Sequence, residues 1–199
     1  MNKNWIPHPT ILTGQTVNLL PLQKEHFEEL YVAASDKELW QLIPTDCSVK
    51  KTFEKTYAAS LSEREKGNEY PFVIYHKPTK KIIGSTRFFE IFPEHRKLEI
   101  GWTWIAKEYW GTKVNLECKL ALLTFCFETL KTIRVQLKTK DTNERSRKAI
   151  EKIGGKFEGI LRKDKIQANG TTRNAAYFSI LDDEWENART KIMTQLDDQ

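Results

Sequence analysis

The alternation of apolar and polar residues predicts β-strands in several parts of the chain. The clearest case is 133–139, where Ile133, Val135 and Leu137 alternate with polar residues. A shorter alternation that reaches Pro21 predicts a first strand. The predicted strands are Thr16–Leu22, Phe72–Tyr75, Ile82–Ile91, Lys97–Ile105, Ile133–Thr139, Lys156–Gln167 and Thr171–Leu181. The three central ones are separated by short polar turns, which predicts an antiparallel meander.

Apolar residues spaced three or four apart predict helices between these strands. The predicted helices are Lys24–Ser35, Ser48–Lys66, Asn115–Phe127, Glu144–Ile153 and a short polar helix that begins at Asp183. Ser48 and Asn143 stand where N-caps are expected, and Gly154-Gly155 ends the fourth helix. Asn169-Gly170 suits a type I′ turn, which predicts that the last two strands form a hairpin.

The order of elements predicts an α/β domain (α+β, mixed sheet) of about seven strands flanked by helices. The unit formed by 97–105, 115–127 and 133–139 makes the sheet mixed, because a strand–helix–strand connection favours a parallel pair. With 199 residues and 39% hydrophobic side chains, the chain can bury one core, so we expect a single domain over residues 1–199. A Gly-rich fingerprint after the first strand is absent, which excludes a dinucleotide-binding domain.

The charge and the cysteines narrow the class of protein further. A net charge of +5 with mixed signs and no basic runs argues against a nucleic-acid-binding arm, although a basic surface favours anionic ligands. Neither a leading hydrophobic segment nor an apolar run of about 18 residues occurs, so we expect a cytoplasmic protein without a membrane span. The 3 cysteines and 4 histidines lack metal-ligand spacing, and we predict no metal.

The segment from Glu99 to Asn115 is a strand, a short loop around Gly111 and the start of a helix. Such a turn presents unpaired backbone N–H groups and the positive end of a helix dipole, which suits a phosphate. Every strand-to-helix turn offers such groups, however, so the pattern alone is a weak indication.

Several motifs in order along the chain resemble the GNAT superfamily of N-acetyltransferases, and within it the RimJ/RimL-like branch that includes N-terminal acetyltransferases of ribosomal proteins. The resemblance covers nearly the whole chain. It rests on Leu19-Leu20-Pro21-Leu22, Ala33-Ala34-Ser35-Asp36, Glu99-Ile100-Gly101-Trp102, Tyr109-Trp110-Gly111, Asn143, 146–154, Glu158-Gly159, Leu161-Arg162 and 177–185.

The resemblance implies a binding site for acetyl-CoA. The backbone at Trp104 and Ile105 would pair with the pantetheine arm. The pyrophosphate would lie on Trp110, Gly111, Thr112, Lys113, Val114 and Asn115. Asn143 would contact the arm, Ser146 would lie near the sulfur and donate to the departing thiolate, and Arg147 or Lys148 would meet the 3′-phosphate; Asn143 and Ser146 can also be a simple N-cap and an exposed serine. The loop departs from the family pattern at Glu108 and at Lys113. The Lys113 side chain would crowd the phosphate if the backbone there has positive φ, or it would add a charge-assisted contact to the pyrophosphate.

The resemblance also implies a mechanism in which a neutral amine attacks acetyl-CoA directly, without a cysteine nucleophile. Glu99 is the candidate general base, and its alternative role is an ion pair with Arg87 or Arg96. Glu90 and His95 are weaker candidates. A backbone N–H near Thr103 or Trp104 would polarise the acetyl oxygen.

Aromatic residues cluster around the same block. We interpret Trp102 as core packing and place Trp104 at the ligand. Trp40, Phe88 and Phe89 are candidates for lining the acceptor cleft.

The predicted function is therefore N-acetylation of a primary amine, with a protein N-terminus favoured by the branch. Antibiotics, polyamines and metabolites are alternative acceptors, and a non-catalytic acyl-CoA-binding module is an alternative function. The expected partners are acetyl-CoA and the acceptor, without nucleic acid or membrane, in a monomer or homodimer.

Overall fold

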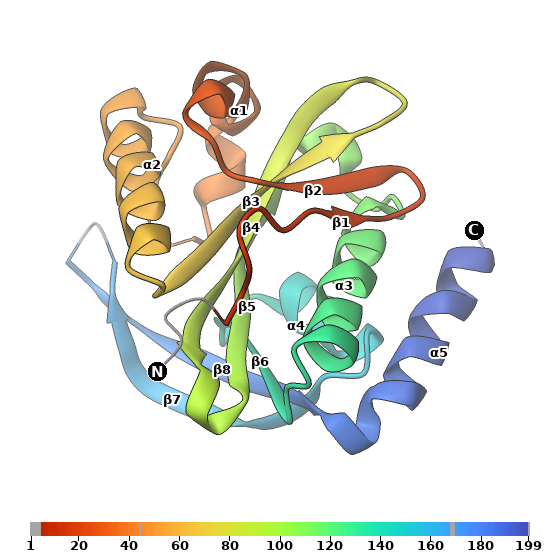
Figure 1. Ribbon diagram of the computed structural model, residues 1–199. Helices are drawn as coiled ribbons and strands as arrows, with labels where there is room; N and C mark the ends of the chain where they lie inside the picture. Colours follow the sequence, from red (N-terminus) through yellow and green to blue (C-terminus); the bar gives the residue numbers. More distant parts are fainter. Residues whose placement is uncertain (1–4, 44, 168–169, 199) are drawn as a thin grey trace.

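A computed structural model describes residues 5–43, 45–167 and 170–198 as a mixed sheet with helices on both faces (Figure 1). Eight strands form the sheet in the order β1-β2-β3-β4-β5-β6-β8-β7. They are β1 (Leu12–Thr13), β2 (Val17–Pro21), β3 (Glu69–His76), β4 (Lys81–Phe92), β5 (Lys97–Ile105), β6 (Arg134–Lys140), β7 (Lys156–Ile166) and β8 (Thr172–Leu181). The predicted fold class is confirmed. The additional strand is β1, whose two residues are too few to carry an alternating pattern.

The helices match the predicted ones with changed ends. They are α1 (Phe27–Ala34), α2 (Lys50–Glu65), α3 (Val114–Thr124), α4 (Glu144–Lys152) and α5 (Trp185–Asp197). Asn143 caps α4 as predicted, since its Oδ1 accepts a hydrogen bond from Ser146 N at 3.1 Å. The predicted cap at Ser48 is wrong, because Val49 precedes α2 and the Ser48 hydroxyl donates to Asp46 instead.

The C-terminal helix α5 has 13 residues and is not the short polar helix expected. It buries Trp185, Ala188 and Ile192, so one face of the helix belongs to the core. A pattern with only three core positions in 13 residues is easily taken for a polar segment. Asn169 of the predicted turn lies outside the described residues, while Gly170 has the positive φ of 81° that such turns need.

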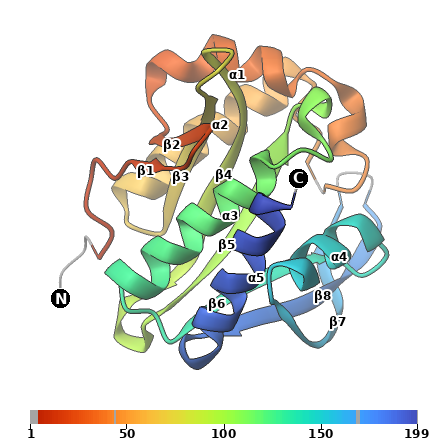
Figure 2. The ribbon, with the colours of Figure 1, turned by 90° about the vertical axis from the view of Figure 1, so that its right-hand side faces the viewer.

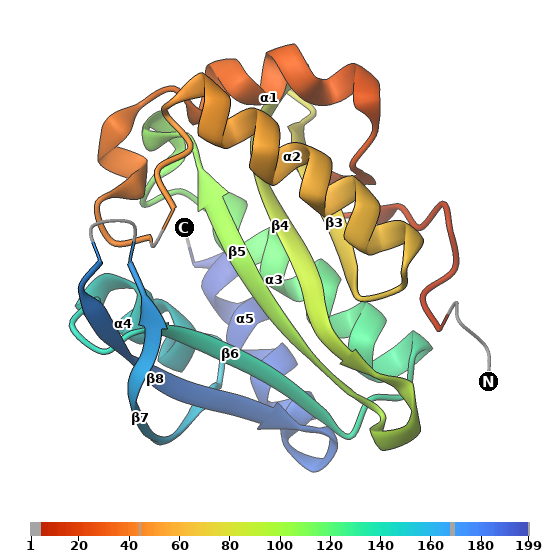
Figure 3. The ribbon, with the colours of Figure 1, turned by 90° about the vertical axis from the view of Figure 1, so that its left-hand side faces the viewer.

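Two hydrophobic cores lie on opposite faces of the sheet. One is formed with α3, α4 and α5, which lie together on the same face (Figure 2). The other is formed with α1 and α2, which cover β3 and β4 on the opposite face (Figure 3). We call these the α3 face and the α2 face. A side chain on β5 therefore lies in one of two different environments.

The central parallel pair, β5 and β6, is joined by α3 and remains together for only a short distance. Backbone pairing covers Lys97↔Arg134, Leu98↔Val135 and Glu99↔Gln136. Beyond Glu99 the two strands diverge, as Figure 3 shows, while β4 continues to pair with β5 as far as Ile105. Among the residues that the structure describes, the edge of β5 that faces β6 therefore lacks a strand partner from Ile100 onwards.

Candidate active site

A β-bulge shapes β5 at the point where it separates from β6. Trp102 has a positive φ of 51°, and the pairing with β4 shifts between Ser85↔Trp104 and Arg87↔Gly101. A bulge inserts one extra residue and so reverses which face the following side chains point to. As a result Thr103 lies on the α3 face, where it meets Lys119, and Trp104 lies on the α2 face.

Glu99 occupies the last paired position before β5 and β6 diverge, and it is only 1% exposed to solvent. Its Oε2 accepts a hydrogen bond from Gln136 Nε2 at 2.7 Å and pairs with Lys138 Nζ at 3.1 Å. Its Oε1 is buried and has no hydrogen-bond partner among the residues that the structure describes. A buried carboxylate oxygen without a partner is costly, so it is suited to receive a proton or a ligand N–H.

The environment of Glu99 gives it the proton affinity of a general base. Burial raises the pKa of Glu99 to about 7, although Lys138 and Gln136 oppose the rise by stabilising the carboxylate. Burial alone would lower the pKa of Lys138, but Glu99 and Glu90 together raise it above the ordinary value. Lys138 is therefore a cation, and Glu99 is able to change protonation near neutral pH.

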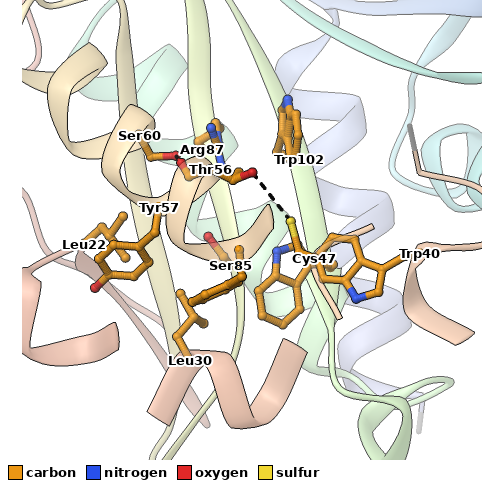
Figure 4. Close-up of a pocket in the computed structure, with 12 residues that line it drawn as sticks. Leu22, Leu30, Trp40, Cys47, Thr56, Tyr57, Ser60, Ser85, Arg87 and Trp102 are labelled. Carbon is orange, nitrogen blue, oxygen red and sulfur yellow. Dashed lines mark hydrogen bonds between the residues drawn. The ribbon is translucent and has the colours of Figure 1, made fainter. Parts of the chain in front are cut away.

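The alternative considered for Glu99, an ion pair with Arg87 or Arg96, is wrong, because the cation that Glu99 pairs with is Lys138. Arg87 Nη1 pairs with Glu69 Oε2 at 2.7 Å, and its guanidinium lies 4.6 Å from the centre of the Trp102 ring. Figure 4 shows Arg87 and Trp102 beside a cavity between α2 and the sheet. The cavity has a volume of about 20 Å³ and also borders Trp40, Cys47 and Trp104. It has room for about one water molecule.

The bulge also reverses the roles expected for the two tryptophans. Trp102 lies outside both hydrophobic cores and stacks on Arg87, so its interpretation as core packing is wrong. Trp104 is 7% exposed and packs against Trp40 with ring centres 5.3 Å apart, so its ring is a core element that borders the cavity. The backbone of Trp104 belongs to the part of β5 that β6 does not pair with, and its carbonyl lies against Gly84 of β4.

The loop that precedes α3 has the open backbone expected of an anion site. Gly111 has a φ of 76°, and a Cβ placed there would meet no atom within 4 Å. The N–H groups of Gly111 and Lys113 make no hydrogen bond within the described part of the chain. Thr112 closes the loop, since its Oγ1 donates to Tyr109 O at 2.7 Å.

Lys113 does not crowd this loop. Its φ is −64°, in the ordinary helical region, so the backbone strain considered from the sequence does not arise. Its ammonium donates to the carbonyl of Leu196 near the end of α5. The side chain is therefore directed to the C-terminal helix and leaves the open amides accessible.

Two further contacts hold the loop against its surroundings. Trp110 Nε1 donates to the Ile105 carbonyl at 2.8 Å, which ties the loop to the end of β5. The Arg145 guanidinium lies 3.8 Å from the centre of the Trp110 ring, a cation–π contact that brings the start of α4 to the same loop. The loop at 110–115 and the segment at 143–147 thus lie together, as expected for one ligand site.

The three predicted residues at the start of α4 differ in how they are held. Asn143 uses Oδ1 for the cap, and its Nδ2 makes no hydrogen bond within the described residues. Ser146 is half-buried, and its hydroxyl is likewise unbonded there. Arg147 donates through Nη1 to Asp141 O at 3.2 Å and lies over the Phe157 ring, so part of its guanidinium is already engaged.

The other residues considered as a general base or as lining of the acceptor cleft lie in different environments. Phe88 is fully buried on the α3 face beside Phe125, so its placement in the cleft is wrong. Phe89 lies near Glu99 and under Lys138. Glu90 joins the same cluster, with Oε1 at 3.0 Å from Lys138 Nζ. His95 is exposed in the β4–β5 turn, where its Nε2 lies 4.0 Å from Glu94 Oε1.

The three cysteine side chains lie in the two hydrophobic cores. Cys47, Cys118 and Cys126 are free and buried, and burial raises the pKa of the Cys118 thiol to about 12. Within residues 5–43, 45–167 and 170–198, three or more His, Cys, Asp or Glu side chains nowhere gather as a metal site. In the same residues, each helix is too short or too polar to cross a membrane.

Sequence reasoning missed Gln136 and Lys138, which contact Glu99, and Lys119, which contacts Thr103. The first two could have been found, because the alternation over 133–139 places both on the face opposite Val135 and Leu137. Lys119 interrupts the apolar stripe of the helix predicted over Asn115–Phe127. A lysine at that position was itself a signal.

The comparisons with known proteins agree on one family. Residues 16–156 match the acetyltransferase (GNAT) domain. A segment of 108 residues is 39% identical to "Putative ribosomal N-acetyltransferase YdaF" of Bacillus subtilis (strain 168) and covers 54% of this chain and 58% of YdaF, less than two thirds of that relative.

Solved structures share the fold over nearly the whole chain. A GCN5-related N-acetyltransferase from Brucella melitensis has a TM-score of 0.86 at 24% identity and covers 94% of this chain and 86% of its own. Mycobacterium smegmatis RimJ in complex with CoA-disulfide has a TM-score of 0.81 at 19% identity. The match covers 94% of this chain and 95% of the RimJ chain. At these identities the likeness concerns the fold alone.

Proposed function

The chain belongs to the GNAT acetyltransferase family, and from that premise we propose that it is an acetyl-CoA-dependent N-acetyltransferase whose acceptor is the N-terminal amine of a protein. The name of one relative, "Putative ribosomal N-acetyltransferase YdaF", supports this acceptor. The observation that carries the proposal is the buried carboxylate of Glu99, with one oxygen unpaired, at the point where β5 and β6 separate.

The residues present fit acetyl-CoA on three observations. Within the described residues β6 does not pair with β5 beyond Glu99, so the backbone at Trp104 and Ile105 would hold the pantetheine arm, with the Ile105 carbonyl also accepting from Trp110 Nε1. The open amides around Gly111 and the N-terminus of α3, from Trp110 to Asn115, would hold the pyrophosphate. The unbonded Asn143 Nδ2 would donate to the arm. When bound, acetyl-CoA supplies an acetyl thioester whose carbonyl carbon a neutral amine attacks, which gives an amide and CoA.

Glu99 would accept the proton of the acceptor amine at Oε1. An ammonium group must lose a proton before it becomes a nucleophile, and a carboxylate with a pKa of about 7 is matched to that task near neutral pH. Lys138 and Gln136 hold Oε2, which keeps the carboxylate oriented with Oε1 free. Such a positioned base is worth about 10²- to 10⁴-fold in rate.

The other roles follow from the unused donors around the divergence. A backbone N–H near Thr103 or Trp104, on the open edge of β5, would donate to the developing oxyanion. The Ser146 hydroxyl would donate to the departing sulfur. Arg147 retains guanidinium N–H groups beyond the one on Asp141 and would pair with a 3′-phosphate.

The experiment that tests the function follows CoA release from acetyl-CoA with three kinds of acceptor: short peptides with free α-amino groups, the same peptides blocked at the N-terminus, and small amines. We expect turnover of the free peptides only. Turnover of small amines alone would refute the protein acceptor and leave the acetyltransferase. Binding of acetyl-CoA without turnover of any acceptor would identify a non-catalytic module.

Glu99→Gln is the variant that tests the base. We expect a loss of about 10²- to 10⁴-fold in kcat and the disappearance of the limb of the pH–rate profile that rises through about pH 7. Glu90→Gln is the matched control, because Glu90 touches the same Lys138 and Gln136 from an exposed position. The Glu90→Gln protein should keep the rising limb of the pH–rate profile, and its kcat should fall by less than about tenfold. Equal effects of the two substitutions would contradict the assignment of Glu99.

A further inference from the structure

Lys119 is a buried lysine in the middle of α3 that the proposed mechanism does not use. The residue is 7% exposed, and its neighbours in the helix, Cys118 and Leu122, are fully buried. Lysine is almost never buried to this extent without a charged partner. Its position in the core therefore calls for a reason other than packing.

The ammonium group has one hydrogen-bond partner in the described residues. Its Nζ donates to Thr103 Oγ1 at 2.9 Å, and Thr103 Oγ1 in turn lies 2.8 Å from Thr86 Oγ1. No carboxylate of the described residues lies within the 4.0 Å of an ion pair. An ammonium has three N–H donors, so two of them are left over in a site with little water.

The place of the ammonium is set by the bulge in β5. Because Trp102 inserts an extra residue, the Thr103 side chain points to α3 rather than to the α2 face. Thr103 lies four residues beyond the last β5–β6 pair, where the edge of β5 is open. The spare donors of Lys119 thus lie on the α3 face of the part of β5 that β6 does not pair with, on the opposite face from Glu99.

We infer that Lys119 is a ligand-binding residue whose spare N–H groups donate to a carbonyl oxygen of the acyl-pantetheine arm. The inference rests on the proposed function, since it needs an arm between β5 and β6. That arm offers two sources of carbonyl oxygen, the thioester and the pantetheine amides. If the thioester is bound, the positive charge also stabilises the oxyanion that forms during attack, which assists the backbone N–H groups.

The test compares the dissociation constants of acetyl-CoA and CoA, by isothermal titration, for the wild type and Lys119→Met. Methionine has a similar length and no donor. A hydrogen bond to a charged group corresponds to about 10- to 100-fold in affinity. Weakening by about this factor for acetyl-CoA alone assigns the thioester carbonyl, and weakening for both ligands assigns a pantetheine amide. Unchanged affinity for both would overturn the inference.

Thr86→Val is the matched control. It removes the hydroxyl that lies 2.8 Å from Thr103 Oγ1 and leaves both Thr103 and the ammonium in place, so acetyl-CoA affinity should stay within about threefold of the wild type. If Thr86→Val weakens binding as much as Lys119→Met, the effect comes from the packing of this polar cluster and the inference is wrong. Thermal unfolding of each variant checks the fold. Failure of the wild type to bind acetyl-CoA would refute the proposed function itself.

Discussion

The stability of the protein should increase when Lys119 is replaced by methionine. Burial lowers the pKa of Lys119 from 10.5 to about 8, because the charged form loses its hydration. The single hydroxyl of Thr103 does not replace the lost water. Below about pH 8 the lysine is protonated in both folded and unfolded chains, and the folded state bears the full cost of the buried charge. Between about pH 8 and 10.5 the unfolded chain holds a proton that the folded chain has released, so the cost declines as the pH rises.

The magnitude follows from the same two values. The difference between 10.5 and about 8 is roughly 2.5 pH units, which at about 1.4 kcal/mol per unit is about 3 kcal/mol near neutral pH. Loss of the hydrogen bond to Thr103 offsets about 1 kcal/mol, and Thr103 retains Thr86 as a partner. Lys119→Met should therefore raise the free energy of unfolding by about 2 kcal/mol at about pH 7, and Tm by about 4–8 °C.

Denaturant unfolding of both proteins at about pH 7 and about pH 9.5 measures this difference. We expect the advantage of Lys119→Met to shrink by about 2 kcal/mol at the higher pH, because most of the cost has then been relieved. Lys148→Met, which removes an exposed lysine from α4, should stay within about 0.5 kcal/mol of the wild type at both values. A Lys119→Met protein that is less stable near neutral pH, with a difference that does not change with pH, would refute the reasoning.

Two further substitutions test the ligand site. Gly111→Ala should weaken acetyl-CoA binding by at least about tenfold, because its methyl group would occupy the space proposed for a phosphate. Gly170→Ala is the control, since Gly170 has a similar φ of 81° and equally open space around its Cβ position. The Gly170→Ala protein should bind acetyl-CoA normally. Asn143→Asp should keep the cap of α4 and its stability but weaken binding, since it replaces the free amide donor with a negative charge. Asn143→Ala should also lose about 1 kcal/mol of stability. Titration calorimetry and thermal unfolding measure both pairs, and normal binding by Asn143→Asp would limit Asn143 to the cap.

The sequence predicted the elements whose patterns are local. The alternation over 133–139 became β6, the apolar stripe from Asn115 became α3, and Asn143 caps α4. It failed where the pattern was too short or too sparse, as in β1 with two residues and α5 with three core positions. Ser48 was a plausible cap by residue type, but Asp46 offers its hydroxyl a partner before the helix begins.

The candidate site was predictable as a stretch of chain but not in its side-chain directions. Strict alternation along β5 from Glu99 assigns Trp102 and Trp104 to the same face as Ile100. The bulge at Trp102 breaks that count, so both rings border the cavity on the α2 face and Thr103 turns to α3. A positive φ at a tryptophan has no signature in the sequence, because propensity favours glycine or asparagine there.

The same bulge sets the surroundings of the two charged groups that lie on opposite faces of β5. Glu99 precedes it and lies on the α2 face, where Lys138 and Gln136 orient its carboxylate. Lys119 reaches Thr103, which follows it, from the α3 face. Without the extra residue Thr103 would point to the side of Glu99, and the ammonium would lose its hydroxyl partner. The positive φ at Trp102 and the buried charge of Lys119 both cost stability. The unpaired Oε1 of Glu99 and the spare N–H groups of Lys119 lie on opposite faces of β5, which is the arrangement that the proposed proton removal from an amine and the proposed donation to a carbonyl oxygen would use.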